Sequence, residues 1–149
     1  MANIFFTKEG LEKVKKEHKE LTEKRKGAVE TLKRAREMGD LSENGLYKAA
    51  KFELGNIDRT LRQLSHYINK GVLAAKPTGI IGIGSEVTLT EEGKKKEFFI
   101  VGDIEANPSK NKISSNSPLG KALMNRKIGE TVGVETPGGK KSYKIISIT

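Results

Sequence analysis

The chain of 149 residues contains no cysteine and no tryptophan, and aromatic residues make up only 5% of it. Without cysteine it cannot form disulfides, thiolate nucleophiles or cysteine-ligated zinc sites, which is compatible with a reducing compartment. No apolar run approaches the ~20 residues of a membrane span, and the N-terminus lacks the apolar segment of a signal peptide. We therefore expect a soluble cytoplasmic protein without a membrane partner.

Motifs of self-contained enzyme sites are also absent. The sequence has no Walker A motif, and the glycines between 79 and 84 lack the order and following helix of a dinucleotide-binding loop. It shows no Ser/His/Asp arrangement or nucleophile elbow. His18 and His66 have no metal-ligand partner at helical spacing, so both are expected to be ordinary structural residues. The chain alone offers almost nothing for catalysis.

Charged residues are abundant, at 32% of the chain against 35% hydrophobic residues. This composition indicates much exposed helix surface. The formal net charge of +9, from 28 basic and 19 acidic residues, favours polyanionic partners or acidic protein surfaces. The positive excess is spread over both halves, so it does not establish nucleic-acid binding by itself.

The first half has helical periodicity, with two runs of seam residues spaced alternately by three and four. The first run is Leu11, Val14, His18, Leu21, Arg25, Ala28, Leu32 and Ala35; the second is Tyr47, Ala50, Leu54, Ile57, Leu61, Leu64 and Ile68. Thr7 and Ser42 are expected to cap the two helices, and Gly39 to end the first. A short turn forces antiparallel packing, and about 30 helical residues rise roughly 45 Å.

The second half changes to a β pattern. Strands are expected over 80–90, 97–101, 112–115, 131–136 and 142–148, with a turn at Pro137-Gly138-Gly139. Ser117 and Pro118 predict the cap and first residue of a short helix. Lys94-Lys95-Lys96 is interpreted as a solvated hairpin loop. We predict an α+β protein with a helical hairpin over 1–75 and a compact α+β domain over 76–149.

The turn between the two helices carries two acids, Asp40 and Glu43. They have a simple structural explanation, because Asp40, Ser42 and Asn44 could end one helix and cap the next, and Glu43 favours a helix N-terminus. The functional alternative is a Mg²⁺ site, since hard cations bind carboxylate oxygens. Two acids at an exposed tip would bind Mg²⁺ weakly alone. Such a site would be half a site, completed by carboxylates or phosphates of a partner.

Basic residues surround the same turn: Arg34, Arg36, Lys48 and Lys51. They are either a solvated helix face or contacts to a phosphate backbone, which lysine and arginine bind without sequence preference. Their clustering beside the acids slightly favours the phosphate interpretation.

Several strings resemble the Gre family of bacterial transcript cleavage factors. In the first half they are Ala35-Arg36-Glu37-Met38-Gly39-Asp40-Leu41-Ser42-Glu43-Asn44, Tyr47 and Ala50-Lys51. In the second half they include Ile100-Val101-Gly102, Glu105-Ala106, Ile113-Ser114, Ser117-Pro118-Leu119-Gly120-Lys121-Ala122-Leu123, Gly129 and Thr136-Pro137-Gly138-Gly139. The likeness covers nearly the whole chain in the family's order, so the strings are highly specific together.

The resemblance implies a coiled-coil hairpin, a C-terminal domain of FKBP-like fold, and RNA polymerase as partner. The globular domain would dock at the rim of the polymerase's secondary channel through Ser117, Pro118 and Leu119. The hairpin would enter the channel, where Asp40 and Glu43 would help hold a catalytic Mg²⁺ at the polymerase active centre. The polymerase would then cut the 3′ end of backtracked nascent RNA. The protein would be a monomeric accessory factor rather than an enzyme.

The resemblance also implies roles for residues beside the acids. Ser42 and Asn44 would support the attacking water or the RNA, and Arg36, Lys48 and Lys51 would contact RNA. The chain departs from the family at Gly45-Leu46, where Ala-Glu is usual. The departure removes one acid near the tip and, through Gly45, costs up to about 1 kcal/mol of helix propensity.

Three other functions compete with transcript cleavage. A related channel-binding regulator would act without cleavage, although retention of both acids argues against it. A prolyl isomerase would need an aromatic pocket, and residues 71–149 offer only Phe98, Phe99 and Tyr143. A coiled-coil adaptor or chaperone would leave the paired acids unexplained.

Overall fold

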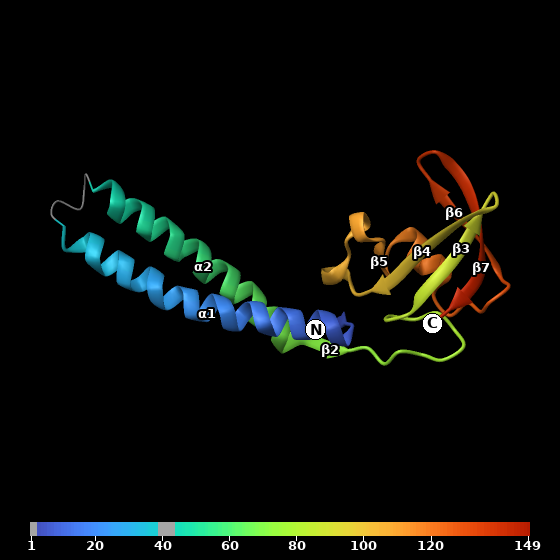
Figure 1. Ribbon diagram of the computed structural model, residues 1–149, viewed down its shortest axis with the longest axis horizontal. Coiled ribbons are helices and arrows are strands. Elements are labelled where there is room, and N and C mark those ends of the chain that lie inside the picture. The colour runs from blue at the N-terminus through green and yellow to red at the C-terminus, as the bar shows by residue number, and fades with distance from the viewer. Residues whose placement is uncertain (1–2, 39–43) are drawn as a thin grey trace. The chain divides into compact units, whose positions relative to one another are not determined.

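The computed structural model describes residues 3–38 and 44–149 of the chain (Figure 1). They form two compact units, which are described separately. One unit is the helical hairpin Leu11–Lys70. The other is a β-rich unit that combines Gly71–Thr149 with the N-terminal residues up to Gly10, which the sequence analysis had assigned to the hairpin.

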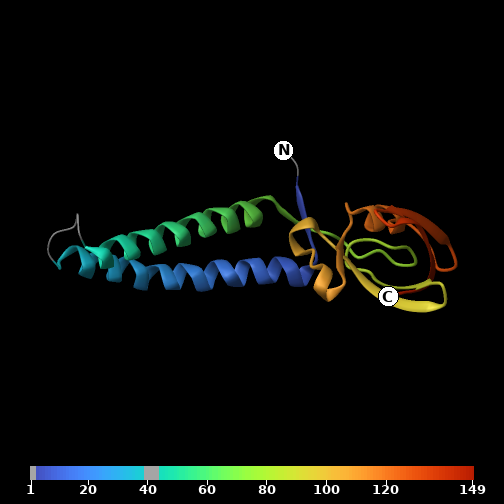
Figure 2. The same ribbon diagram turned by 90° about the horizontal axis from the view of Figure 1, so that it is seen from above.

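The hairpin consists of α1 (Lys8–Arg36) and α2 (Gly45–Lys70), which lie side by side and antiparallel in both views (Figures 1 and 2). The predicted seams are confirmed. From residue 11 to residue 36 only the eight seam positions of α1 are buried or half-buried, and every other side chain is exposed. The most deeply buried seam residues are Val14, Ala28, Ala35, Ala50, Ile57 and Leu64. Burial of this apolar stripe, rather than helix propensity, stabilises the pair.

The two polar seam positions of α1 find partners on α2. His18 Nε2 lies 3.0 Å from Ser65 Oγ. The Arg25 guanidinium donates to Asp58 through Nε at 2.5 Å and through Nη2 at 3.4 Å. This hydrogen bond, helped by the opposite charge, lowers the pKa of Asp58 and raises that of Arg25. The seam is therefore interrupted by matched polar pairs and not by unsatisfied groups.

A parallel pair of short strands that the sequence did not predict, β1 (Ile4–Phe6) and β2 (Gly71–Leu73), belongs to the β-rich unit. Phe6 is fully buried there. The predicted cap Thr7 is confirmed, because its Oγ1 accepts from Gly10 N at 3.1 Å. The Glu105 carboxylate in turn accepts from Thr7 N at 2.7 Å and from the Thr7 hydroxyl. These contacts hold the N-terminal segment within the unit.

The main sheet has five strands in the order β5-β4-β3-β7-β6. Only the β4–β5 pair is parallel. The bounds are β3 Glu86–Glu91, β4 Lys94–Val101, β5 Lys112–Ser114, β6 Thr131–Thr136 and β7 Gly139–Ile148. Short 3-10 turns, η1 (Asp103–Glu105) and η2 (Pro108–Lys110), and the helix α3 (Pro118–Leu123) complete the unit. The α+β class predicted from the sequence is confirmed.

The core lies on one face of this curled sheet. Alternating residues of the strands point into it, as the period of two requires. Its fully buried aliphatic side chains are Ile81, Val87, Leu89, Ile100, Leu123 and Ile145. No helix in the described residues is long and apolar enough to cross a membrane.

One loop prediction was wrong. Lys94-Lys95-Lys96 are the first residues of β4 rather than a hairpin loop. The turn before them is Glu92-Gly93, both with positive φ, at 49° and 81°. A two-residue hairpin turn of this hand matches the twist of the flanking strands, so the strand begins directly after the glycine.

Candidate functional site

Asp40 and Glu43, the predicted metal-assisting acids, lie outside the described residues, and so do Ser42 and the predicted helix stop Gly39. The structure describes the base of the tip on both sides, from Ala35 to Met38 and from Asn44 onward. The described residues contain no cluster of three or more His, Cys, Asp or Glu side chains that could hold a metal ion.

Asn44 joins the two helices at the base of the tip. Its side-chain nitrogen donates to the carbonyl of Ala35 in the last turn of α1 at 2.7 Å. Its side-chain oxygen accepts from Tyr47 N at 3.0 Å. The second bond makes Asn44 the N-cap of α2, a place that the sequence analysis had given to Ser42. One side chain thus binds the Ala35 carbonyl of α1, which also accepts from Met38 N at 3.2 Å, and the Tyr47 amide in the first turn of α2.

A second link crosses the hairpin beside Asn44. The guanidinium carbon of Arg36 lies 6.0 Å from the centroid of the Tyr47 ring, within the range of a cation–π contact. Below it Ala35 and Ala50 are buried, at 4% and 5% exposure, and their small side chains allow close approach of the helices. The base of the tip is therefore narrow and tied together by side chains from both helices.

Lys48 and Lys51, which were predicted to contact RNA, are exposed in the first two turns of α2. The residues at the family departure are exposed as well. No heavy atom comes within 4 Å of a Cβ built on Gly45, and Leu46 is 61% exposed. The structure thus brings Arg36, Asn44 and Tyr47 together and leaves both lysines facing solvent.

The predicted docking segment forms the start of α3. Ser117 is its N-cap, with Oγ accepting from Gly120 N at 3.1 Å, and Pro118 is the first helical residue, as predicted. Pro118 is exposed, whereas Leu119 is half-buried and packs against the domain core. A side chain on Gly120 would overlap the Ser114 carbonyl, so only glycine permits this close approach.

Asp103 organises the turn that leads into α3. Its carboxylate accepts from the Ser114 hydroxyl and from Asn116 Nδ2, which lies 2.9 Å from Oδ2 and 3.2 Å from Oδ1. These hydrogen bonds lower the pKa of Asp103, because they stabilise its charged form. Ser114 Oγ also accepts from Asn116 N at 3.0 Å, which closes the network.

Comparison with known proteins bears on both units. The family model "Transcription elongation factor, N-terminal" matches residues 4–72, and "Transcription elongation factor, GreA/GreB, C-term" matches residues 76–149. Transcription elongation factor GreA of Geobacillus kaustophilus is 40% identical over 148 residues, covering 95% of this chain and 94% of the relative. GreA of Bacillus cereus strain AH187 is 39% identical with the same coverage. The chain belongs to the GreA/GreB family of transcription elongation factors.

Among solved structures, GreA factor homolog 1 of Thermus thermophilus is 28% identical over 99% of both chains, with a TM-score of 0.47. The family resemblance read from the sequence is confirmed by the family models and the relatives. Asp103, which organises the turn before the predicted docking segment of this GreA/GreB family member, was not predicted from the sequence. Its partners Ser114 and Asn116 lie 11 and 13 residues further along the chain, and no local sequence pattern predicts hydrogen bonds over that separation.

Proposed function

We propose that this GreA/GreB family member binds RNA polymerase and stimulates cleavage of the 3′ end of backtracked nascent RNA. The hydrolysis takes place in the polymerase's own active centre, so the chain is a monomeric cytoplasmic accessory factor and not an enzyme. The observation that carries the proposal is the match of both family domains to one chain whose hairpin retains two carboxylates at its turn.

The two units divide the work. The hairpin enters the secondary channel, and the globular unit docks at its rim through the region of Ser117, Pro118 and Leu119. The capped start of α3 and the Asp103 network support this docking role, because they hold the segment in one conformation before it meets a partner. A preorganised segment loses less conformational entropy on binding.

The donor chemistry of the tip fits Mg²⁺, since Asp40 and Glu43 are hard oxygen ligands and a protein commonly supplies one or two carboxylates to this ion. When bound, Mg²⁺ supplies charge stabilisation and a more acidic water. Asp40 and Glu43 would hold the ion and help to orient the attacking water, and Ser42 would support the water or RNA. Lys48, Lys51 and Arg36 hold the RNA phosphates beside them.

A cleavage assay tests the proposal. Backtracked polymerase complexes with 3′-labelled RNA are incubated with the chain and Mg²⁺, and the released 3′ fragments are counted over time. We expect the wild-type chain to accelerate release, and Asp40→Asn and Glu43→Gln to abolish most of the acceleration. Both variants should still compete with the wild-type chain for polymerase, because the docking unit is unchanged.

Two outcomes would contradict the proposal in different ways. Wild-type cleavage rates in both variants would remove Asp40 and Glu43 from the mechanism. A wild-type chain that binds polymerase without accelerating cleavage would instead be a channel-binding regulator, in which the tip acids serve another purpose.

A further inference from the structure

Phe52 on α2 is the most exposed large hydrophobic side chain in the described residues, at 71%. It lies between the seam residues Ala50 and Leu54 in sequence but points away from the seam, so it contributes nothing to helix pairing. A single exposed apolar side chain needs no explanation. The residues that share its face of the helix nevertheless indicate a function for Phe52.

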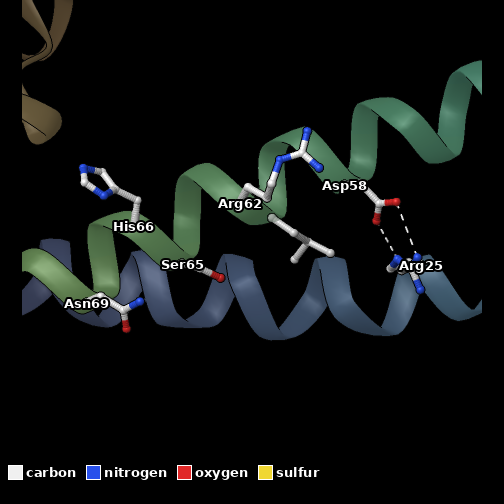
Figure 3. Close-up of a pocket in the computed structure, with 7 residues that line it drawn as sticks. Arg25, Asp58, Arg62, Ser65, His66 and Asn69 are labelled. Carbon is white, nitrogen blue, oxygen red and sulfur yellow. Dashed lines mark hydrogen bonds and ion pairs between the residues drawn. The ribbon is translucent and has the colours of Figure 1, made fainter.

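The outer face of α2 carries a row of basic side chains around Phe52. With a helical step of about 100° per residue, Lys48 lies within roughly 40° of Phe52 and Arg59 within roughly 20°. By the same count Arg62 lies within roughly 80° of Phe52 and His66 within roughly 40°. Figure 3 shows that both side chains project from the side of α2 away from α1. We call these five residues together the outer row: Lys48, Phe52, Arg59, Arg62 and His66.

The outer row contains no acid. Along the described length of α2 the two acids are Glu53 and Asp58. Asp58 faces α1 and is engaged by Arg25 at 2.5 Å. Glu53 follows Phe52 and is therefore rotated about 100° from it. The side chains that lie nearest to Phe52 on this face are thus basic or uncharged, which complements a polyanion.

The surface between Phe52 and Arg59 is also open. Gly55 lies there, and the only heavy atom within 4 Å of a Cβ built on it is Arg59 Nη1, at 3.8 Å. The Arg59 guanidinium leans back along the helix and donates to the Asn56 side chain. An aromatic ring, the open backbone at Gly55 and a planar guanidinium bound to the Asn56 side chain therefore follow one another along this face.

We propose that Phe52 is a base-stacking residue for single-stranded RNA, with Lys48 and Arg59 binding phosphates on either side of it. Exposed aromatic rings set among basic side chains are the usual combination for single-stranded nucleic acids, since every base offers a π face. The inference rests on the proposed function, because it places a base of the extruded RNA beside the hairpin. In the proposed function the basic residues near the tip contact only the RNA backbone, and Phe52 adds a contact to a base.

Fluorescence anisotropy of the full-length chain with labelled ten-nucleotide oligouridylate and oligoadenylate, at low salt, tests the inference. We expect Phe52→Ala and Phe52→Leu to weaken binding about five- to a hundredfold and Phe52→Tyr to retain it. Leu46→Ala is the matched control, because Leu46 is a similarly exposed apolar residue of α2 outside the outer row. Since Phe52 is exposed, these substitutions leave the seam intact.

An abasic oligomer of the same length separates stacking from charge. The wild-type chain and Phe52→Ala should bind it equally, whereas Lys48→Gln should weaken binding to both the abasic and the natural oligomer. Equal binding of natural oligomers by wild type and Phe52→Ala, full binding by Phe52→Leu, or no measurable binding by the wild-type chain would each overturn the inference. Unchanged RNA binding with weaker competition for polymerase would assign Phe52 to a protein contact instead.

The same variants in the cleavage assay keep the two proposals apart. If the wild-type chain accelerates cleavage and Phe52→Ala binds RNA and cleaves normally, the stacking role fails and the cleavage function stands. If the wild-type chain does not accelerate cleavage, the function fails, while the oligonucleotide measurements still decide whether Phe52 stacks on bases.

Discussion

Asn44 makes side-chain hydrogen bonds to both helices at the base of the tip. It caps α2 through Tyr47 N and binds the Ala35 carbonyl of α1 with the other half of its amide. An amide is suited to this position because it carries a donor and an acceptor on one short side chain. A serine hydroxyl in its place loses the bond to the Ala35 carbonyl, and an alanine methyl group loses both bonds.

We predict that Asn44→Ala destabilises the hairpin by about 1–3 kcal/mol, since it removes an N-cap and a cross-helix hydrogen bond. Asn44→Ser should lose less, because a serine hydroxyl still caps α2 but is too short to bridge to Ala35. Urea unfolding followed by the helical circular dichroism signal measures both. Equal stability of Asn44→Ala and the wild-type chain would show that the bridge carries no energy.

Asp103 provides a pH-dependent prediction for the β-rich unit. Its folded pKa is lowered, so its hydrogen bonds stabilise the unit above its ordinary pKa of 3.8 and are lost as the pH falls through the lowered folded value. Asp103→Asn should therefore lower the calorimetric melting temperature at pH 7 and make little difference near pH 2. A deficit of the same size at both pH values would contradict the assigned network.

These residues show where sequence interpretation succeeds and fails. Ser117 and Pro118 were predicted correctly as a helix start because cap and first-turn preferences are local. Asp103 could not be predicted, since its partners are distant in sequence. Gly10 is a similar case. A side chain there would overlap the Glu105 carboxylate. That carboxylate binds Thr7, which is 98 residues away from Glu105 in sequence.

At the scale of the elements, the hairpin was predictable because seam residues recur along each helix at alternating spacings of three and four. The pairing of His18 with Ser65 and of Arg25 with Asp58 was not, because it depends on the register between α1 and α2. The β1–β2 pair was missed because three-residue strands carry no periodic signal. Asp40 and Glu43 were singled out by their chemistry, and their assignment stays a prediction.

Gly27 in the middle of α1 gives a prediction for the helix itself. No heavy atom lies within 4 Å of a Cβ built on it, and the position is exposed. Gly27→Ala should therefore stabilise the hairpin by up to about 1 kcal/mol through helix propensity. Urea unfolding of the chain measures the gain.

Gly102→Ala serves as the contrast, because a side chain at Gly102 would overlap the Phe5 carbonyl and should destabilise the β-rich unit. A neutral or destabilising effect of Gly27→Ala would contradict the prediction. It would mean that a side chain at this exposed position of α1 is opposed by a contact that the structure does not contain.

For the whole molecule, the two units should control different kinetic quantities. In the proposed function, the β-rich unit sets how much of the chain is bound to polymerase at a given concentration. The tip sets how fast a bound complex reacts. A substitution in one unit should therefore change the concentration giving half-maximal cleavage, and a substitution in the other should change the maximal rate.

Pro118→Glu is suited to the first test, because Pro118 is exposed at the first position of α3, where an acid is favourable for the helix. We expect it to raise the half-maximal concentration about tenfold or more and to leave the maximal cleavage rate unchanged. Asp40→Asn should lower the maximal cleavage rate and leave the half-maximal concentration unchanged. Ile128→Glu, at a 58% exposed site of the same unit, is the charge-matched control and should change neither quantity.

The double variant Pro118→Glu/Asp40→Asn decides whether the division holds. If docking and tip chemistry are independent, the double variant shows the higher half-maximal concentration of one single variant and the lower maximal rate of the other. A fall in the maximal rate with Pro118→Glu alone would mean that the docking contact also positions the tip in the active centre. The start of α3 would then contribute to catalysis through the placement of the hairpin and not only through affinity.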